Sequence, residues 1–229
     1  MSLFEAAIGW LAPPQCISCT VEGSALCIAC CKSKITPYGE RCYSCGALSQ
    51  KSKTCPSCYH SNSPRFVWVT TNYEATAQKL VKLYKFGQQR AAAKTLAKMM
   101  STTVLSQTGS ATLAGYLVVS VPTATSRIRE RGFDHAATLA RCVAISLGLE
   151  YARALGRLGQ TRQIGSRRTD RLNQIAGSYF VRKPSLVTGR KILLVDDVVT
   201  TGATLQAATS ALKAAGATRV DAIVFAKRL

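Results

Sequence analysis

Acidic residues are scarce in this chain of 229 residues. There are 11 aspartates and glutamates against 30 lysines and arginines, so the formal net charge is +19. A chain of this sign attracts polyanions, so we expect a nucleic acid, an anionic membrane surface or a pyrophosphate-bearing substrate as a partner. Residues 1–60 contain five basic and three acidic side chains. The basic character therefore belongs to the larger, C-terminal part of the chain.

The sequence also lacks an apolar run long enough to cross a bilayer. Its first residues show neither a basic stretch before an apolar segment nor a clear cleavage site, so we expect a short amphipathic helix over residues 2–11 and a cytoplasmic protein. No Gly-x-x-x-x-Gly-Lys run occurs, which excludes a P-loop. With 47% hydrophobic residues, the chain can bury the core of one α/β domain beside a small module.

Cysteine is concentrated in one segment, since nine of the ten cysteines lie before residue 60. Eight of them form four C-x-x-C pairs, and two such pairs can supply four thiolates to one tetrahedral zinc ion. Bound metal would supply folding free energy that this apolar-poor stretch lacks. A disulfide framework would require export, and a redox dithiol would be a single motif. We therefore predict a zinc-ribbon module over residues 1–62 and a second domain over residues 63–229.

The cysteine spacing favours two sequential structural zinc sites, although an interleaved arrangement also fits it. Cys31 could replace Cys30, and Cys142 falls in a helical pattern where an inert core position is expected. Because the module is nearly neutral, we expect it to be structural or to contact another protein. The predicted ligands are Cys16, Cys19, Cys27 and Cys30 in the first site and Cys42, Cys45, Cys55 and Cys58 in the second.

One stretch near the C-terminus organises the larger domain. Residues 192–195 are consecutive apolar side chains, which is typical of a strand buried on both faces. Asp196 and Asp197 follow where open α/β sheets place their ligand crevice, and their carboxylates can accept hydrogen bonds from a ribose diol or hold Mg²⁺ through water. The plain alternative is a buried strand that leads into a capped helix. A phosphate-binding loop at the helix N-terminus is predicted at Thr200, Thr201, Gly202, Ala203 and Thr204.

Alternating apolar runs predict a mostly parallel sheet flanked by helices. Helices are expected over residues 75–100, with a break at Gly87, and over residues 136–147. Several lysines, Lys85 among them, flank the amphipathic face of the first helix, and we expect most of these lysines to be solvated. The remaining strands are expected at residues 66–71, 116–121, 178–181 and 220–225.

Two arginine-rich segments are candidate anion sites, because the guanidinium fork donates two parallel hydrogen bonds to phosphate. In the first, Phe133 could stack on a base if it is exposed, and the alternative is a basic surface turn with a buried Phe133. The arginines of the first segment are Arg127, Arg129 and Arg131. Those of the second, which only Asp170 opposes, are Arg153, Arg157, Arg162, Arg167, Arg168 and Arg171.

The stretch over residues 191–204 closely resembles the signature with which type I phosphoribosyltransferases bind phosphoribosyl pyrophosphate (PRPP). The resemblance implies a type I phosphoribosyltransferase-like α/β fold. It also implies that Asp196 and Asp197 lie on the ribose hydroxyls and that the loop from Thr200 to Thr204 holds the 5′-phosphate. The loop that follows the strand at residues 116–121 would approach the pyrophosphate, which makes Pro122 and Thr123 candidates.

The order of the motifs along the whole chain is similar to that of the ComF competence family. Besides the cysteine pairs and the signature, the similarity includes Lys-Phe-Gly at residues 85–87, Arg-Gly-Phe at residues 131–133 and Arg171-x-Asn173. It implies binding of PRPP, Mg²⁺ and single-stranded DNA during natural transformation, with DNA-uptake proteins contacting the zinc module. The chain departs from the family at Asp134 and His135, where Asn-Gln is usual, and we expect His135 to be a simple helix N-terminal residue.

An active phosphoribosyltransferase of nucleotide metabolism or salvage is the alternative function. Asp196 and Asp197 would then lie at the reacting ribose, and the arginines of residues 127–131 would neutralise the pyrophosphate leaving group. No base-reading segment is recognisable after the signature, so the sequence names no acceptor.

Overall fold

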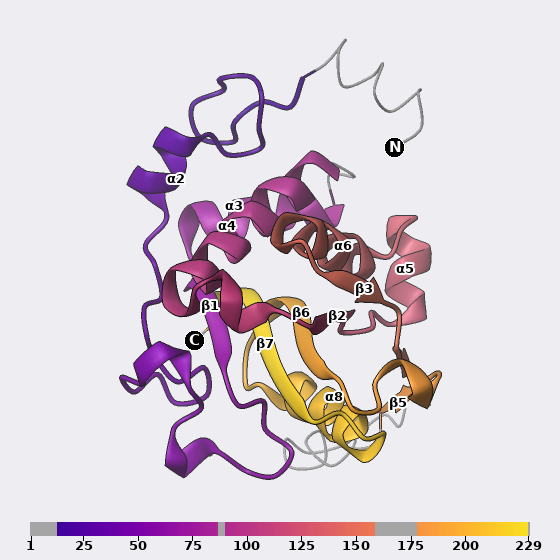
Figure 1. Ribbon diagram of the computed structural model, residues 1–229. Coiled ribbons are helices and arrows are strands. Elements are labelled where there is room, and N and C mark those ends of the chain that lie inside the picture. The colour runs from indigo at the N-terminus through magenta and orange to yellow at the C-terminus, as the bar shows by residue number, and fades with distance from the viewer. Residues whose placement is uncertain (1–12, 87–89, 159–177, 229) are drawn as a thin grey trace, which may run out of the picture.

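The computed structural model describes residues 13–86, 90–158 and 178–228 (Figure 1). Its centre is a five-stranded sheet in the order β1-β7-β6-β2-β3, and every neighbouring pair is parallel. These strands are β1 (Val67–Asn72), β2 (Tyr116–Ser120), β3 (Glu150–Ala152), β6 (Lys191–Val199) and β7 (Arg219–Lys227). The predicted α/β class, with a mostly parallel sheet flanked by helices, is confirmed.

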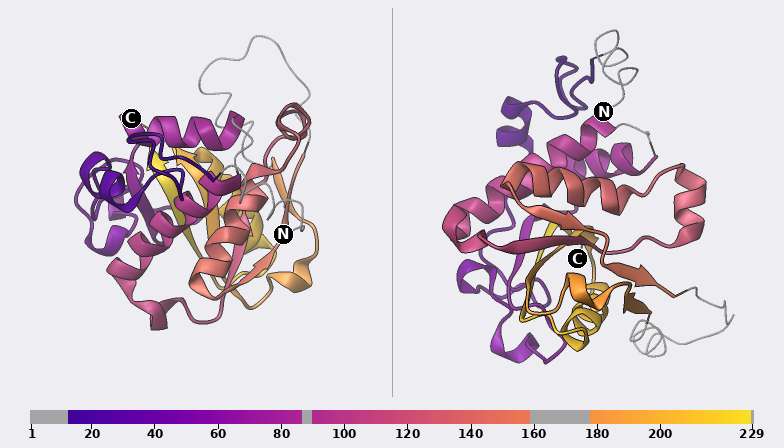
Figure 2. Two further views of the ribbon diagram at one scale, coloured as in Figure 1. Left: turned by 90° about the horizontal axis from the view of Figure 1, so that it is seen from above. Right: turned by 45° about the vertical axis from the view of Figure 1, so that its right-hand side comes forward.

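Helices cover both faces of the sheet, as the views in Figures 1 and 2 show. The buried residues of α3, α4 and α6 form one core cluster with one face of the strands, and those of α8 form a second cluster with the other face. The helices are α2 (Ile28–Lys34), α3 (Ala75–Phe86), α4 (Arg90–Thr108), α5 (Thr125–Arg131), α6 (His135–Leu147) and α8 (Ala203–Ala214). The predicted break at Gly87 falls in residues 87–89, outside the described part of the chain.

Both faces of β6 are buried, as its run of apolar residues predicted. Leu193 and Val195 face the helices α3, α4 and α6, whereas Ile192 and Leu194 face α8. This alternation follows from the two-residue period of a strand. The strand is longer than expected, because it includes both aspartates and ends at Val199.

Two segments differ from the sequence-based expectation. Residues 125–131 form the helix α5, which ends at Gly132 in a left-handed conformation. The predicted strand at residues 178–181 is β5 (Tyr179–Val181), which pairs antiparallel with β4 (Leu155–Arg157) in a separate two-stranded sheet. The first difference arises because a left-handed Gly can end a helix as well as form a turn, and the second because strand propensity does not specify which partner a strand finds.

The cysteine-rich segment runs along the sheet edge formed by β1 (Figure 1). Isolated bridges join Pro37 to Thr71 and Lys53 to Phe66, and the backbone N–H of Tyr38 donates to the carbonyl of Thr70. Short 3-10 turns at Gln50–Ser52 and Pro56–Cys58 complete the segment. The division predicted between residues 62 and 63 falls in a turn before β1 and stays a prediction.

Within the described ranges, no helix combines the length and the apolar character that a bilayer span requires. Two further 3-10 turns lie at Ser110–Leu113 and Pro184–Leu186. Both turns connect elements of the α/β domain.

Candidate ribose phosphate site

The topology of the sheet creates a crevice at the carboxyl ends of β2 and β6. The chain leaves β2 towards β3 on one side of the sheet, and it leaves β6 towards β7 on the other. Loops that diverge from neighbouring parallel strands leave a crevice between them, and this is where open α/β sheets bind their ligands. Because β2 ends opposite Val195, the last residues of β6 extend past it and border this crevice.

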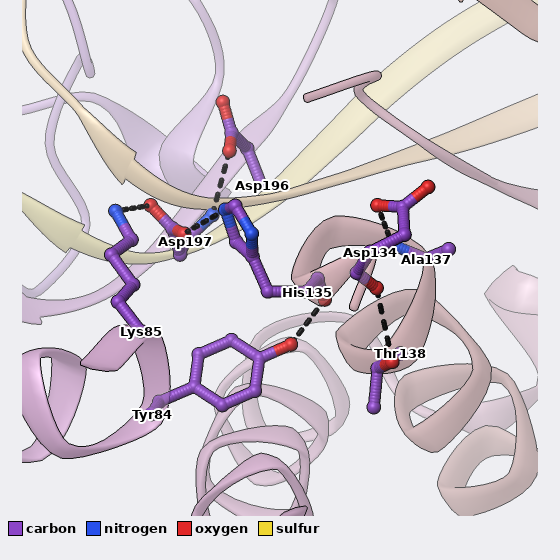
Figure 3. Close-up of polar contacts among 8 residues, drawn as sticks. All are labelled: Tyr84, Lys85, Asp134, His135, Ala137, Thr138, Asp196 and Asp197. Atoms are coloured by element: carbon purple, nitrogen blue, oxygen red, sulfur yellow. Dashed lines mark hydrogen bonds and ion pairs between the residues drawn. The ribbon is translucent and has the colours of Figure 1, made fainter. Parts of the chain in front are cut away.

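Asp197 lies between two basic side chains from different helices (Figure 3). Its Oδ1 is 2.7 Å from Nζ of Lys85, which projects from the end of α3. Its Oδ2 is 3.6 Å from Nε2 of His135, the first residue of α6. The Asp197 side chain is only 8% exposed, so it needs a counter-charge, and Lys85 supplies it. His135 is the first residue of α6, as expected, but its role is not simply that of a helix start, because its imidazole also lies beside Asp197.

A hydroxyl from α3 fixes the backbone at the start of α6. The Tyr84 hydroxyl donates to the carbonyl of His135, and burial raises the pKa of this hydroxyl, so it stays protonated as a donor. The N-cap of α6 is Asp134, whose Oδ1 accepts the N–H of Ala137 at 3.2 Å. This cap orients the first turn of α6 towards β6.

Asp196 points away from Asp197 and belongs to a different environment (Figure 3). Its Oδ1 accepts the backbone N–H of Asp197 at 2.8 Å. Burial, followed by the charge of Asp197, raises the pKa of Asp196 to about 7, although the N–H bond and Lys85 oppose the shift. The free site therefore exchanges a proton with solvent near neutral pH, and a cation bound at Asp196 would displace that proton.

The loop after β6 leads into α8 without a side-chain cap. The N-cap position is Gly202, whose φ is +84°, and the hydroxyl of Thr201 accepts the N–H of Ala203 at 3.4 Å. Thr200 and Thr201 are exposed, and the Lys227 ammonium donates to the carbonyl of Thr200 from behind the loop. A helix start of this kind leaves backbone N–H groups directed at the crevice, where they suit a phosphate.

This geometry agrees with a comparison against protein families. Residues 128–229 match the model of the phosphoribosyl transferase domain. The match includes β6, the acid pair, the loop at residues 200–204 and α8. Together with the parallel sheet, it makes the α/β domain phosphoribosyltransferase-like.

Two solved structures are similar in fold. One is described as the allosteric regulatory enzyme of purine biosynthesis, and the other is glutamine PRPP amidotransferase from B. subtilis in complex with ADP and GMP. They are 20% and 19% identical to this chain over 62% of its length, each with a TM-score of 0.43. The chain covers 29% and 30% of their lengths, so it spans less than a third of either. A search of curated proteins found no match.

The other residues predicted to contact the ligand lie in the segment that follows β2. Pro122 and Thr123 follow β2 and are half-buried. Arg129 is exposed on α5, and Arg127 and Arg131 belong to the same helix. Phe133 is half-buried, and its ring packs edge-on against Tyr84 with centroids 6.2 Å apart. Its proposed role in base stacking stays a prediction.

The second arginine-rich segment is described only in part. Arg153 pairs with Asp134, and Arg157 lies over the ring of Tyr179. Its other arginines lie in residues 159–177, outside the described part of the chain, as does Asn173. These four arginines are Arg162, Arg167, Arg168 and Arg171.

The cysteines form two clusters, and both are sequential rather than interleaved. One brings together Cys16, Cys19, Cys27 and Cys30, and the other brings together Cys42, Cys45, Cys55 and Cys58. Within each cluster the sulfur atoms lie within 4.8 Å of one another. The Cys19 and Cys27 sulfurs are 3.6 Å apart, as are those of Cys45 and Cys55.

These distances fit a tetrahedral zinc ion, because Zn–S bonds of about 2.3 Å place the sulfurs about 3.8 Å apart. Backbone N–H groups also point at the thiols, with the N–H of Cys27 3.4 Å from the Cys16 sulfur and that of Cys30 3.4 Å from the Cys27 sulfur. Each cluster can therefore hold one zinc ion.

The sequence contained weak signals for the side chains that complete the site. Lys85 is one of several lysines along an amphipathic helix, and the sequence gives no measure of its distance from Asp197. His135 follows a good N-cap residue, which suggests a helix start but not the direction of the imidazole. The contact of each with the acid pair arises from helix packing over the sheet.

The Lys85–Asp197 pair leads to a prediction about stability. Lys85→Gln leaves a buried carboxylate without its main counter-charge, which costs about 3–5 kcal/mol in a fully buried pair. Because Lys85 is 21% exposed, we expect a loss of about 2 kcal/mol in the free energy of unfolding, measured by urea denaturation. Lys82→Gln, at an exposed position of the same helix, is the matched control and should change stability by less than about 0.5 kcal/mol. Equal effects of the two changes would contradict this role.

Asp196 leads to a prediction about pH. Its pKa of about 7 in the folded protein lies above the value of about 4 for an unfolded carboxyl, so folding binds a proton between these values. The stabilisation that this proton uptake gives the folded protein is fully present below pH 4 and is lost as pH rises towards 7. Asp196→Asn cannot lose stability in this way. Between pH 4 and pH 8 we therefore expect the free energy of unfolding of the variant to rise by roughly 1–3 kcal/mol relative to that of the parent.

Urea unfolding at several pH values measures this difference. The control is Glu74→Gln, which changes an exposed carboxyl at the start of α3. A pH-independent difference between Asp196→Asn and the parent protein would refute the titration.

Proposed function

We propose that the protein binds PRPP with Mg²⁺ at the crevice between β2 and β6 and binds single-stranded DNA through its arginine-rich segments. The observation that supports the proposal is the match of residues 128–229 to the phosphoribosyl transferase domain, because the matched range includes the acid pair and the capless start of α8. In this arrangement, residues 200–204 hold the 5′-phosphate, and Asp196 and Asp197 accept from the ribose hydroxyls.

The same residues suit Mg²⁺, which prefers carboxylate oxygen, water and substrate phosphates as ligands. Asp196 offers a carboxylate that releases its proton near pH 7, and Asp197 offers the oxygen that Lys85 does not occupy. The metal would neutralise the charge of the pyrophosphate when both are bound. The described residues hold the ribose and the 5′-phosphate independently of it.

DNA binding is supported by charge. The chain carries a net charge of +19, and Arg129 and Arg153 are exposed, although Arg153 also pairs with Asp134. Phosphate contacts by arginine release counterions, so this binding would depend strongly on salt. With the resemblance to the ComF family, these features support a role in DNA uptake during natural transformation, in the cytoplasm, with the zinc module contacting uptake proteins.

Transfer of the phosphoribosyl group is the second candidate function, and the domain match favours it. Pyrophosphate release from PRPP in the presence of a nucleobase would distinguish an enzyme from a binding protein. In an enzyme, Asp196 and Asp197 would stabilise the ribosyl centre, and the arginines of α5 would lie near the leaving group.

Calorimetric titration with PRPP and Mg²⁺ tests the first part of the proposal. We expect micromolar affinity for the wild-type chain, and a loss of about 100-fold when Asp196 and Asp197 are both changed to Asn, because two charged hydrogen-bond acceptors are removed. Glu74→Gln, which changes an exposed carboxyl, should bind as the wild type does. Retained PRPP affinity in the double variant would overturn the site.

The salt dependence of single-stranded DNA binding tests the second part. Each phosphate contact adds roughly −0.7 to the slope of log K against log salt concentration. Changing Arg127, Arg129 and Arg131 to Ala should therefore make the slope less negative by up to about 2. The matched control removes three exposed lysines, Lys79, Lys82 and Lys98, and should change the slope by less. Equal slopes in the two triple variants would move the DNA site away from α5.

A further inference from the structure

The second cysteine cluster lies against the loop that we propose for phosphate binding. Tyr43 follows Cys42 directly, and both residues are 0% exposed. Its side chain belongs to the core cluster that contains Val199, from the end of β6, and Leu205, from the first turn of α8. A tyrosine of the cysteine-rich segment therefore lies beneath residues 200–204.

The Tyr43 ring contacts Gly202 so closely that no other residue fits there. A Cβ added to Gly202 would lie 2.4 Å from Cε2 of Tyr43 and 3.2 Å from its Cδ2. Gly202 also has a φ of +84°, a conformation in which any side chain would be strained. The ring is thus packed against the one loop residue whose backbone sets the direction of the turn into α8.

The turn between the paired cysteines determines where Tyr43 lies. The backbone N–H of Cys42 donates to Ala47, the N–H of Gly46 donates back to Cys42, and the Tyr38 hydroxyl donates to the Cys42 carbonyl. The Cys42 sulfur belongs to the second cluster. A metal ion in that cluster would complete the constraint, since its ligands in this short segment have few apolar neighbours of their own.

The first cluster makes no comparable contact among the described residues. Cys16 and Cys30 pack with Leu26 into the other core cluster, on the face of the sheet covered by α3 and α4. The two clusters therefore differ in what they support, although their ligands are alike.

We propose that Tyr43 is a positioning residue for the phosphate loop, and that zinc in the second cluster sets the affinity for the 5′-phosphate through it. This inference rests on the proposed binding of ribose phosphate at residues 200–204. The ring makes the contact. The Tyr43 hydroxyl is buried without a well-formed hydrogen bond in the described part of the chain, so we expect the ring rather than the hydroxyl to carry the effect.

Calorimetry with two probes tests the inference. Ribose 5-phosphate reports on the loop at residues 200–204, and inorganic pyrophosphate reports on the other side of the crevice. We expect Tyr43→Ala to weaken ribose 5-phosphate binding about tenfold, because ordering one released loop residue costs about that factor. Pyrophosphate affinity should stay within about twofold. Tyr43→Phe keeps the ring and should bind both probes as the wild type does.

A second pair of variants isolates the metal and leaves Tyr43 in place. Cys45 and Cys19 are the exposed ligands of the second and first clusters, respectively. Each change to Ser should lower the zinc content of the purified protein, and Cys45→Ser should weaken ribose 5-phosphate binding more than Cys19→Ser does. Equal losses, or equal falls for both probes, would overturn the inference. Absence of binding by the wild-type chain would instead refute the proposed function.

Discussion

A buried negative charge is the constraint on which the crevice depends. Asp197 lies inside the sheet, where an unpaired carboxylate would be very unfavourable, and Lys85 must reach it from α3. The pairing holds the last turn of α3 near Asp197. The hydroxyl of Tyr84, one residue before Lys85, donates to the carbonyl of His135 and so holds the start of α6 near the same carboxylate. Two helices that are distant in sequence are thus held above one strand end by groups that converge on a single carboxylate.

The neighbouring carboxyl, that of Asp196, does not need such a counter-charge. The two acids of the pair therefore differ in their chemistry. Asp196 has no cation in direct contact among the described residues, and its pKa near 7 lets it lose charge when the site is free. Asp197 is paired with Lys85, whereas burial raises the pKa of Asp196 to about 7. A ligand that brings positive charge, such as a metal ion on a pyrophosphate, would favour the ionised form of Asp196. The site would then gain its second negative charge when the ligand binds.

The sequence was informative wherever a property is local. The apolar run before Asp196 predicted β6, and the four C-x-x-C pairs predicted two sequential clusters that the structure contains. It was uninformative wherever the property depends on packing. No local pattern relates Lys85 to Asp197, which lie 112 positions apart, or Tyr43 to Gly202. Residues 125–131 form a helix although their charged side chains and terminal Gly132 suggested a turn, because a Gly in a left-handed conformation also ends helices.

The position of the cysteine-rich segment has a consequence for how the sheet meets solvent. The strand β1 lies at the edge of the sheet, its residues Val67, Trp68 and Val69 are buried, and bridges from Pro37 and Lys53 flank this apolar stretch. An exposed edge of this composition offers unpaired backbone groups to any other extended chain and promotes self-association. The segment therefore acts as a cover for the edge. We expect a fragment that begins at β1 to expose the edge of this strand and to self-associate more readily than the whole chain.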